Sequence, residues 1–234
     1  MEALELRRAY RDLTTAHVAD ALIRLGLPVR SAPAGVLPLW EGAHLVGRAL
    51  PARHYGSVDV FLEAIDRAEP GDVLVVDNAA REDESCVGDL AAHEAAAAGL
   101  AGIAIWGYHR DTADLRRIRL PVFSRGALPA GPQRLDEREP DALAWAAFGP
   151  HRITAADFVV GDDDGLVFAP LDHAAAIADA AAVIRDVERR QADRLRQGAT
   201  LREQVRFAEY LAARDRDGTT FRQHLRAIGG AIEE

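Results

Sequence analysis

The stretch Gly88–Asp111, GDLAAHEAAAAGLAGIAIWGYHRD, decides the fold that we expect for this chain. Residues 90–98 are nearly all small and apolar, which predicts a buried helix with Asp89 at its N-cap. Gly99 ends this helix, and the apolar run over residues 100–106 predicts a strand. Residues 107–111 form the predicted loop at the end of the strand. Helix and strand in alternation are typical of an α/β fold.

The segments around this stretch continue the alternation. A helix over residues 58–68 and a turn at 69–72 precede residues 73–77, VLVVD, which predict a strand buried on both faces. Further strands are predicted at residues 120–124, 157–161 and 166–169, with short strands and turns between 28 and 53. Between the last two strands, Asp162–Gly165 (DDDG) predicts a hairpin turn. A calcium loop would need ligands spread over about twelve residues.

Helices are predicted at both ends of the chain. Residues 3–26 have helical spacing, with Thr14 or Thr15 able to cap the start of the segment that Gly26 ends. Residues 174–197 predict one long helix, and more helical sequence follows it. We therefore expect an α/β domain over residues 1–170 that carries the functional site. The C-terminal helices of residues 171–234 would pack on that domain or on a neighbouring subunit.

Composition excludes several classes of protein. The 234 residues carry a formal charge of −9, which disfavours a general nucleic-acid binder. The sequence has no apolar run long enough to span a membrane, no apolar signal core in its opening residues, and a single cysteine, so we expect a cytoplasmic protein. It also contains no lysine. Schiff-base catalysis and a Walker-type phosphate loop both need a lysine, so neither is available.

The central stretch could bind a small carboxylate and a metal. Arg110 offers a planar fork for a carboxylate, and the backbone amides where the helix begins offer an anion site. Asp111 is a hard oxygen ligand of the kind that magnesium prefers, and Asp89 could hold or deprotonate a metal-bound water. A divalent ion on a keto oxygen would stabilise an enolate, which is the metal route to aldolase chemistry. The ordinary alternatives are a helix cap at Asp89 and a loop salt bridge in Arg110-Asp111.

Three other polar residues, His17, Asp20 and Asp77, each have a structural and a functional interpretation. His17 and Asp20, on the predicted N-terminal helix, suit a solvated or capping pair better than a catalytic one. Asp77 ends a buried strand, where it could either cap the following loop or contribute to function.

Motifs along most of the chain resemble those of the RraA-like family, which includes regulator of ribonuclease activity A and the class II 4-hydroxy-4-methyl-2-oxoglutarate aldolases. The matching segments are TAHVADAL, PGDVLVVD, PVFS and GDDDGLVFAP, together with the glycines and alanine of Gly88–Gly102. The most specific mark is an acid, twenty residues and then Arg-Asp, which Asp89 and Arg110-Asp111 satisfy. The resemblance implies a swivelling β/β/α domain with a C-terminal helical extension, assembled as a homotrimer or hexamer.

The resemblance also implies roles for particular residues. Arg110 and the backbone amides of Gly88, Asp89, Leu90 and Ala91 would bind the pyruvyl carboxylate. Asp111 would ligate Mg²⁺ or Mn²⁺ directly, and Asp89 would act as acid or base through a metal-bound water. A carboxylate from a neighbouring subunit's C-terminal helix would approach the metal waters. By position this is Glu188, with Asp186 and Glu203 as rivals.

The chain departs from the characterised aldolases in several places. Residues 106–109, WGYH, are bulkier than expected before Arg110, and residues 54–57, HYGS, replace a different loop. The roles of His54, Tyr55, Trp106 and His109 are therefore open. They could line the far side of the pocket and change the substrate, and His109 suits packing better than proton transfer.

Three functions are consistent with this sequence. We expect a metal-dependent pyruvate aldolase that could also decarboxylate an oxaloacetate-like acid, and that binds no nucleic acid or membrane. The alternative is a regulatory protein that binds a ribonuclease or another partner without catalysis; Asp89 disfavours it, because the inhibitor branch lacks this acid. A third reading is other chemistry on a sugar acid. No glycine-rich methyl-donor motif supports the methyltransferase name that has also been attached to the family.

Overall fold

The computed structural model describes residues 1–229, and residues 230–234 of the predicted tail lie outside that range. Its main sheet has eight strands in the order β1-β12-β11-β3-β4-β6-β8-β2. The bounds are β1 Arg30–Ser31, β2 Leu37–Pro38, β3 Leu45–Arg53, β4 Val73–Asp77, β6 Gly102–Trp106, β8 Val122–Ser124, β11 Asp157–Asp162 and β12 Gly165–Pro170. Two small sheets pair β5 (Ser85–Val87) with β7 (Tyr108–His109), and β9 (Ala146–Phe148) with β10 (His151–Ile153).

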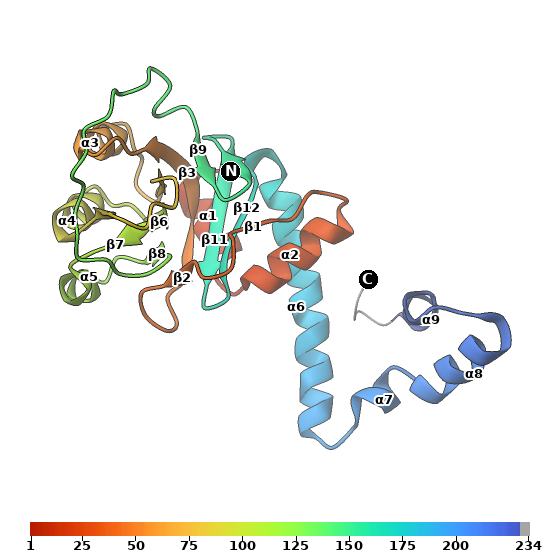
Figure 1. Ribbon diagram of the computed structural model, residues 1–234. Coiled ribbons are helices and arrows are strands. Elements are labelled where there is room, and N and C mark those ends of the chain that lie inside the picture. Colours follow the sequence, from red (N-terminus) through yellow and green to blue (C-terminus); the bar gives the residue numbers. More distant parts are fainter. Residues whose placement is uncertain (230–234) are drawn as a thin grey trace.

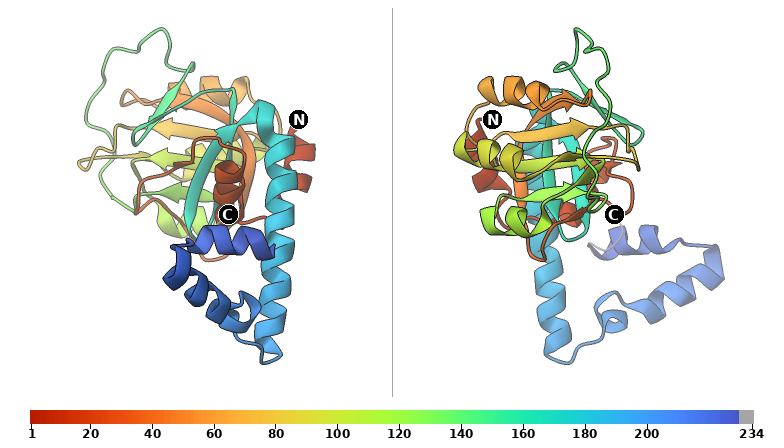
Figure 2. Two further views of the ribbon diagram at one scale, coloured as in Figure 1. Left: turned by 90° about the vertical axis from the view of Figure 1, so that its right-hand side faces the viewer. Right: turned by 60° about the vertical axis from the view of Figure 1, so that its left-hand side comes forward.

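Helices α1 to α6 lie on the two sides of this curled sheet, and α7 to α9 extend away from it (Figures 1 and 2). They are α1 Ala3–Ala9, α2 Thr15–Arg24, α3 Asp59–Asp66, α4 Asp89–Ala97, α5 Thr112–Ile118, α6 Ala174–Arg196, α7 Leu201–Gln204, α8 Phe207–Asp217 and α9 Phe221–Ile228, with a 3₁₀ turn at Leu171–His173. Helices α3, α4 and α5 cover the parallel strands β3, β4, β6 and β8, whereas α1, α2 and α6 pack against β3, β11 and β12.

Three apolar clusters hold the layers together. One joins α3 and α4 to the sheet, and another joins α1, α2 and α6 to it. The third lies inside the curl of the sheet, where Phe123, Phe148 and Phe168 are fully buried. The expected layered α/β fold with a C-terminal helical part is therefore confirmed.

The N-terminal helical segment differs from the prediction. Residues 3–26 form two helices, because the chain turns at Tyr10–Thr14. The buried Tyr10 donates a hydrogen bond from its hydroxyl to the Ala174 carbonyl at 2.7 Å, which fixes the turn against α6. Thr14 caps α2, as predicted, by accepting a hydrogen bond from the His17 amide.

The predicted hairpin at Asp162–Gly165 is confirmed, since it joins the antiparallel strands β11 and β12. Its first carboxylate has a further role that local sequence did not indicate. Asp162 accepts hydrogen bonds from the amide and the hydroxyl of Thr15, both at 2.7 Å, and so ties the start of α2 to the sheet.

The C-terminal helices extend away from the sheet (Figure 1). The first half of α6 packs on the core through Ile177, Ala181 and Ile184, whereas its second half projects and leads to α7, α8 and α9. Among residues 1–229, no helix is both long enough and apolar enough to cross a membrane.

Candidate functional site

The predicted acid lies in the first turn of α4, one position later than expected. Gly88 is the N-cap, with an extended backbone, and its carbonyl accepts a hydrogen bond from the Ala92 amide at 3.2 Å. The prediction of Asp89 as the N-cap is therefore wrong. Asp89 is half-buried, and its Oδ1 accepts a hydrogen bond from the Leu90 amide at 2.8 Å. The helix thus begins with an acid in its first turn, where a negative charge is favoured.

Arg110 and Asp111 reach the same place from the other side. The predicted loop at 107–111 contains the short strand β7, and the Arg110 amide donates to the Val87 carbonyl at 2.9 Å. This bond places Arg110 beside the end of β5, just before Gly88. Asp111 then turns the chain into α5 with a left-handed backbone at φ 57°, which an aspartate tolerates better than most residues.

The structure brings Asp89, Arg110 and Asp111 together at the start of α4. Asp111 Oδ2 accepts a hydrogen bond from the Asp89 amide at 3.4 Å and lies 3.4 Å from Arg110 Nε. The Asp111 and Arg110 side chains are 36% and 49% exposed, so both are open to a ligand. Of the other predicted contact residues, Leu90 turns its side chain to solvent and Ala91 is buried. The roles assigned to these residues remain predictions.

Two glycines leave room for this group. A Cβ at Gly88 would lie 2.4 Å from Asp111 Oδ2 and 3.2 Å from Arg110 Nε. A Cβ at Gly131 would lie 2.6 Å from Arg110 Nη1. Gly131 belongs to the Pro-rich segment 127–139, which therefore passes over the arginine. That contact was not foreseen, because the segment has no regular secondary structure to predict.

The predicted carboxylates of the C-terminal helices have other partners within the described chain. Glu188 lies 3.1 Å from the Nε2 of His17, which joins α6 to α2. Asp186 pairs with Arg185, and Glu203 caps the start of α7 through Thr200. Any approach of Glu188 to the site of a neighbouring subunit stays a prediction.

The bulky residues before Arg110 are packed into the protein. Trp106 contacts Phe148, with ring centroids 5.7 Å apart, and Tyr108 lies under the guanidinium of Arg125. His109 is buried, and its ring nitrogens lie 2.7 Å from Ser124 Oγ and 3.1 Å from Thr112 Oγ1. Burial, with a smaller contribution from Arg116, lowers the pKa of His109. These contacts agree with the packing role expected for His109.

A buried polar cluster near this site escaped the sequence analysis. His54 Nδ1 is 2.9 Å from Asn78 Oδ1, and Glu84 accepts hydrogen bonds from Arg134 Nε and Nη2 at 3.1 and 2.9 Å. Burial is the main cause that lowers the pKa of His54. His54, Asn78 and Arg134 line a cavity of about 310 Å³ that Tyr55 also borders. Within residues 1–229, the Nδ2 of Asn78 has no hydrogen-bond partner. The members of the cluster come from distant segments, so no local spacing could indicate it.

Asp77 acts as a loop cap, one of its two predicted readings. Its carboxylate accepts hydrogen bonds from the amides of Ala79 and Ala147, at 2.8 and 2.9 Å. Both oxygens are therefore engaged in holding the loop after β4 and the start of β9.

Within residues 1–229, no group of three or more His, Cys, Asp or Glu side chains is arranged to hold a metal ion. A site built on the chain's own ligands alone would therefore have few of them. Magnesium commonly binds through one or two carboxylates and keeps several waters, so a single open aspartate such as Asp111 still suits it.

An α/β fold with an acid and an Arg-Asp pair at a helix start defines the class of site in this protein. Comparison with known proteins then gives its family: residues 15–168 match the RraA-like model, described as Aldolase/RraA. The chain belongs to the RraA-like family.

Two relatives and one solved structure describe its place in that family. A protein of Halalkalibacterium halodurans, provisionally named a 4-hydroxy-4-methyl-2-oxoglutarate aldolase, is 28% identical over 69% of this chain and 74% of its own length. Protein DlpA of Legionella pneumophila is 28% identical over 83% of this chain, which spans only 32% of DlpA. One similar solved structure is that of RraAS2 from Streptomyces coelicolor, described as an unusual member of the RNase ES inhibitor RraA protein family. It matches with a TM-score of 0.68 and 28% sequence identity, over 83% of this chain and 96% of the RraAS2 chain. The family thus holds proteins named as lyases and proteins named as inhibitors.

Proposed function

We propose that this chain is a divalent-metal-dependent lyase that breaks a carbon–carbon bond in a pyruvyl-type 2-oxo acid. The observation that carries the proposal is the meeting of Asp89, Arg110 and Asp111 at the start of α4. The aldolase names of relatives such as the H. halodurans protein support it. Retro-aldol cleavage of 4-hydroxy-4-methyl-2-oxoglutarate and decarboxylation of oxaloacetate are the two reactions that we expect.

Arg110 would bind the carboxylate of the pyruvyl group. Its side chain is about half exposed, and the bond from its own backbone to Val87 holds the residue beside the start of α4. A planar fork can bind a carboxylate through two parallel hydrogen bonds, and the helix amides favour the same negative charge. The substrate would therefore be fixed with its keto carbon next to Asp111.

Asp89 would handle the proton. In the retro-aldol direction the substrate's 4-hydroxyl loses a proton, the C3–C4 bond breaks, and its electron pair moves into the enolate of pyruvate. A half-buried carboxylate at the edge of the site can accept that proton, directly or through a water, and return one to C3 of the enolate.

The residues present fit a divalent metal. Asp111 presents a half-exposed carboxylate, and the missing side chain of Gly88 leaves free space that a Cβ would fill beside Oδ2. Asp111 would hold Mg²⁺ or Mn²⁺ directly, with Asp89 near its waters. When bound, the ion would supply positive charge to stabilise the developing enolate oxygen.

A homotrimer or hexamer would complete this site. Glu188 lies on α6 against His17 of its own chain. We propose that the assembly brings it to the site of a neighbouring subunit. We propose this assembly together with the lyase activity, and the mass of the protein in solution tests it.

The decisive experiment measures pyruvate release from both 2-oxo acids after chelator treatment, with and without added Mg²⁺ or Mn²⁺. We expect activity only with metal, and a loss of about a hundredfold or more in Asp111→Ala and Arg110→Ala. Asp164→Ala, in the exposed hairpin turn, serves as the control and should keep full activity. Metal-independent activity would contradict the proposal.

The similarity to an RNase ES inhibitor structure favours one rival, a regulatory protein without catalysis. This rival predicts no turnover of any 2-oxo acid under any metal condition. It also predicts tight binding to a ribonuclease that survives Asp111→Ala. The same purified variants therefore separate the two functions.

A further inference from the structure

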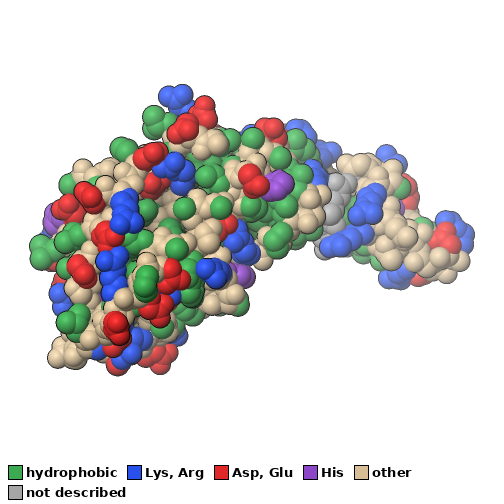
Figure 3. All heavy atoms as spheres, turned by 90° about the horizontal axis from the view of Figure 1, so that it is seen from above, with side chains coloured by type: hydrophobic (Ala, Val, Ile, Leu, Met, Phe, Trp, Pro, Cys, Tyr) green, Lys and Arg blue, Asp and Glu red, His purple; other side chains and the backbone are tan. Residues whose placement is uncertain are grey.

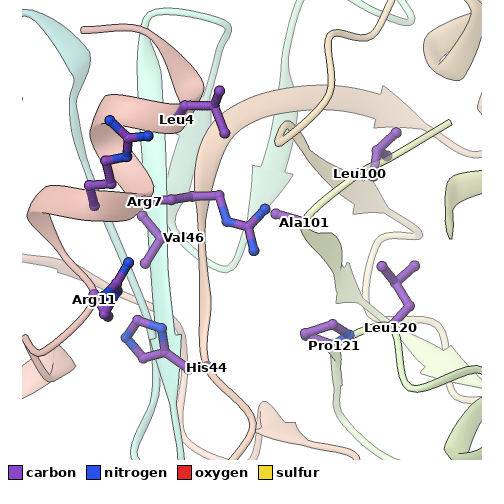
Figure 4. Close-up of a pocket in the computed structure, with 10 residues that line it drawn as sticks. Leu4, Arg7, Arg11, His44, Val46, Leu100, Ala101, Leu120 and Pro121 are labelled. Carbon is purple, nitrogen blue, oxygen red and sulfur yellow. The ribbon is translucent and has the colours of Figure 1, made fainter.

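We propose a second ligand site, for a multiply charged organic anion, on the opposite edge of the sheet from Asp89 and Arg110. The site is a cavity of about 450 Å³ between α1 and the sheet, within the size range of ligand pockets. Figure 4 shows Arg7 extending into it from the helix side, with Arg11 on the same side and Leu120 and Pro121 on the strand side. Arg8 and His44 complete its polar lining, which includes no acidic residue.

The cavity lies where the parallel strands begin. His44 precedes β3, Ala101 precedes β6 and Pro121 precedes β8. The proposed catalytic residues instead follow the strand ends, since Arg110 and Asp111 come after β6 and β7. Because parallel strands have all their starts on one edge, the two sites are separated by the length of the strands.

The arginines of this cavity are unlike most others in residues 1–170. Arg30, Arg48 and Arg134, for example, each bind a carboxylate, and Arg119 and Arg152 stack on tryptophans. Within residues 1–229, the side chains of Arg7, Arg8 and Arg11 form no ion pair, hydrogen bond or ring contact. Three uncompensated cations at one cavity are unusual in a chain with a net charge of −9.

Two carboxylates near the start of β4 are already neutralised. Arg48 binds Glu69 at 2.6 Å and Asp72 at 2.8 Å, at the turn before β4. Within residues 1–229 the arginines of the cavity form no salt bridge, so their positive charge suits an anion from solution.

The lining also specifies the kind of anion. Guanidinium groups bind phosphate and carboxylate oxygens in pairs, so three of them suit a ligand with two or more such groups. Leu100, Leu120 and Val46 give the cavity an apolar side, on which a carbon skeleton can rest. The ligand class is thus an organic phosphate or polycarboxylate rather than a simple inorganic ion.

The framework that carries these arginines is rigid. Leu6 is fully buried, and Glu2 and Glu5 form a capping box at the start of α1. Gly71 lies against α1, with a Cβ there only 3.0 Å from that of Ala3. The backbone that carries these arginines is therefore fixed beside the cavity before any ligand arrives.

Calorimetric titration of the full chain with ADP, citrate and inorganic pyrophosphate tests the proposal, with acetate as a monovalent control. We expect ADP or citrate to bind more tightly than pyrophosphate or acetate, and a tenfold rise in salt to weaken binding strongly. ADP and citrate separate the phosphate source from the carboxylate source.

The variant Arg7→Gln/Arg11→Gln should weaken binding by about tenfold or more. Arg189→Gln/Arg190→Gln removes the same charge from exposed positions of α6 and should leave binding unchanged. Arg110→Ala should also leave it unchanged. Loss of binding in Arg110→Ala alone would place the anion at the proposed catalytic site and overturn the inference.

A second measurement needs no variant. Phenylglyoxal modifies exposed arginines, and mass spectrometry can follow each one in the wild-type chain. We expect ADP or citrate to protect Arg7, Arg8 and Arg11 but not Arg189 and Arg190. If no probe binds, the proposal is overturned. A change of solution mass in Arg7→Gln/Arg11→Gln without anion binding would indicate that another macromolecule covers this face, and would also overturn it.

Discussion

At the scale of single residues, the site depends on two glycines as much as on its charged side chains. Gly88 and Gly131 border the Arg110-Asp111 pair from two directions, and in each the absent Cβ leaves space within 3 Å of a charged group. The spacing from Asp89 to Arg110 could be read from the sequence, because both belong to one continuous stretch. The approach of Gly131 could not, since it depends on how a loop returns to the sheet.

Gly88→Ala should lower activity by about a hundredfold while the protein stays folded. The new Cβ would push Asp111 Oδ2 away from the Asp89 amide, and misplacement of this size is costly in catalysis. Steady-state kinetics at saturating metal measures the effect.

Gly131→Ala is the matched comparison, because its Cβ would meet only the mobile end of Arg110. We expect a higher KM with a much smaller change in kcat. Equal kinetics in wild type and Gly88→Ala would show that the Arg110-Asp111 pair does not act in the reaction.

At the scale of elements, two buried histidines lie at the ends of strands. His54 follows β3, and His109 ends the short strand β7 beside Arg110. Parallel strands end on one edge, so an α/β pattern places such residues in the same region. Their hydrogen-bond partners, Asn78 and Ser124, follow from the register of strands that are distant in sequence.

These histidines should make stability depend on pH. Burial lowers the pKa of both below the ordinary 6.5, so the unfolded chain binds protons that the folded chain does not. The stabilisation that comes from keeping both histidines neutral should therefore be complete above pH 6.5. The free energy of unfolding should fall as the pH drops below 6.5 towards the folded-state pKa values. Urea unfolding between pH 8 and 5.5 measures the slope.

His109→Gln should flatten this slope, whereas His93→Gln, at an exposed position of α4, should leave it unchanged. A stability that rises on acidification through this range would contradict the expected sign.

At the scale of the whole molecule, the segment 127–139 is tied back across the sheet by long-range contacts. Arg134 binds Glu84, the Asn78 side chain and the His54 carbonyl, which joins residues 50 to 80 positions apart. The segment thereby covers the polar cluster and carries Gly131 to Arg110. Its Pro-rich composition alone could not show where the segment returns to the sheet.

Glu84→Gln should destabilise the fold by about 2 kcal/mol, because it leaves Arg134 without its buried charge partner. Glu84 is only 3% exposed in its side chain. Thermal or urea unfolding measures the change.

Glu82→Gln removes a carboxylate of the same loop that is 74% exposed and pairs with Arg125. It should cost less than about 0.5 kcal/mol. Similar small losses in both variants would show that the tie to Arg134 contributes little.

The sequence by itself determined the alternation of helices and strands, the family, and the pairing of Asp89 with Arg110-Asp111 in one stretch. These features depend on hydrophobic periodicity, turn residues and spacing, all of which are local. Only the tertiary structure decided that Gly88 rather than Asp89 caps α4, and that Glu188 pairs with His17 in its own chain. It also decided that Arg7, Arg8 and Arg11 meet the starts of three strands at one cavity. Such contacts depend on strand order and on the path of the chain between elements, which a one-dimensional pattern does not contain.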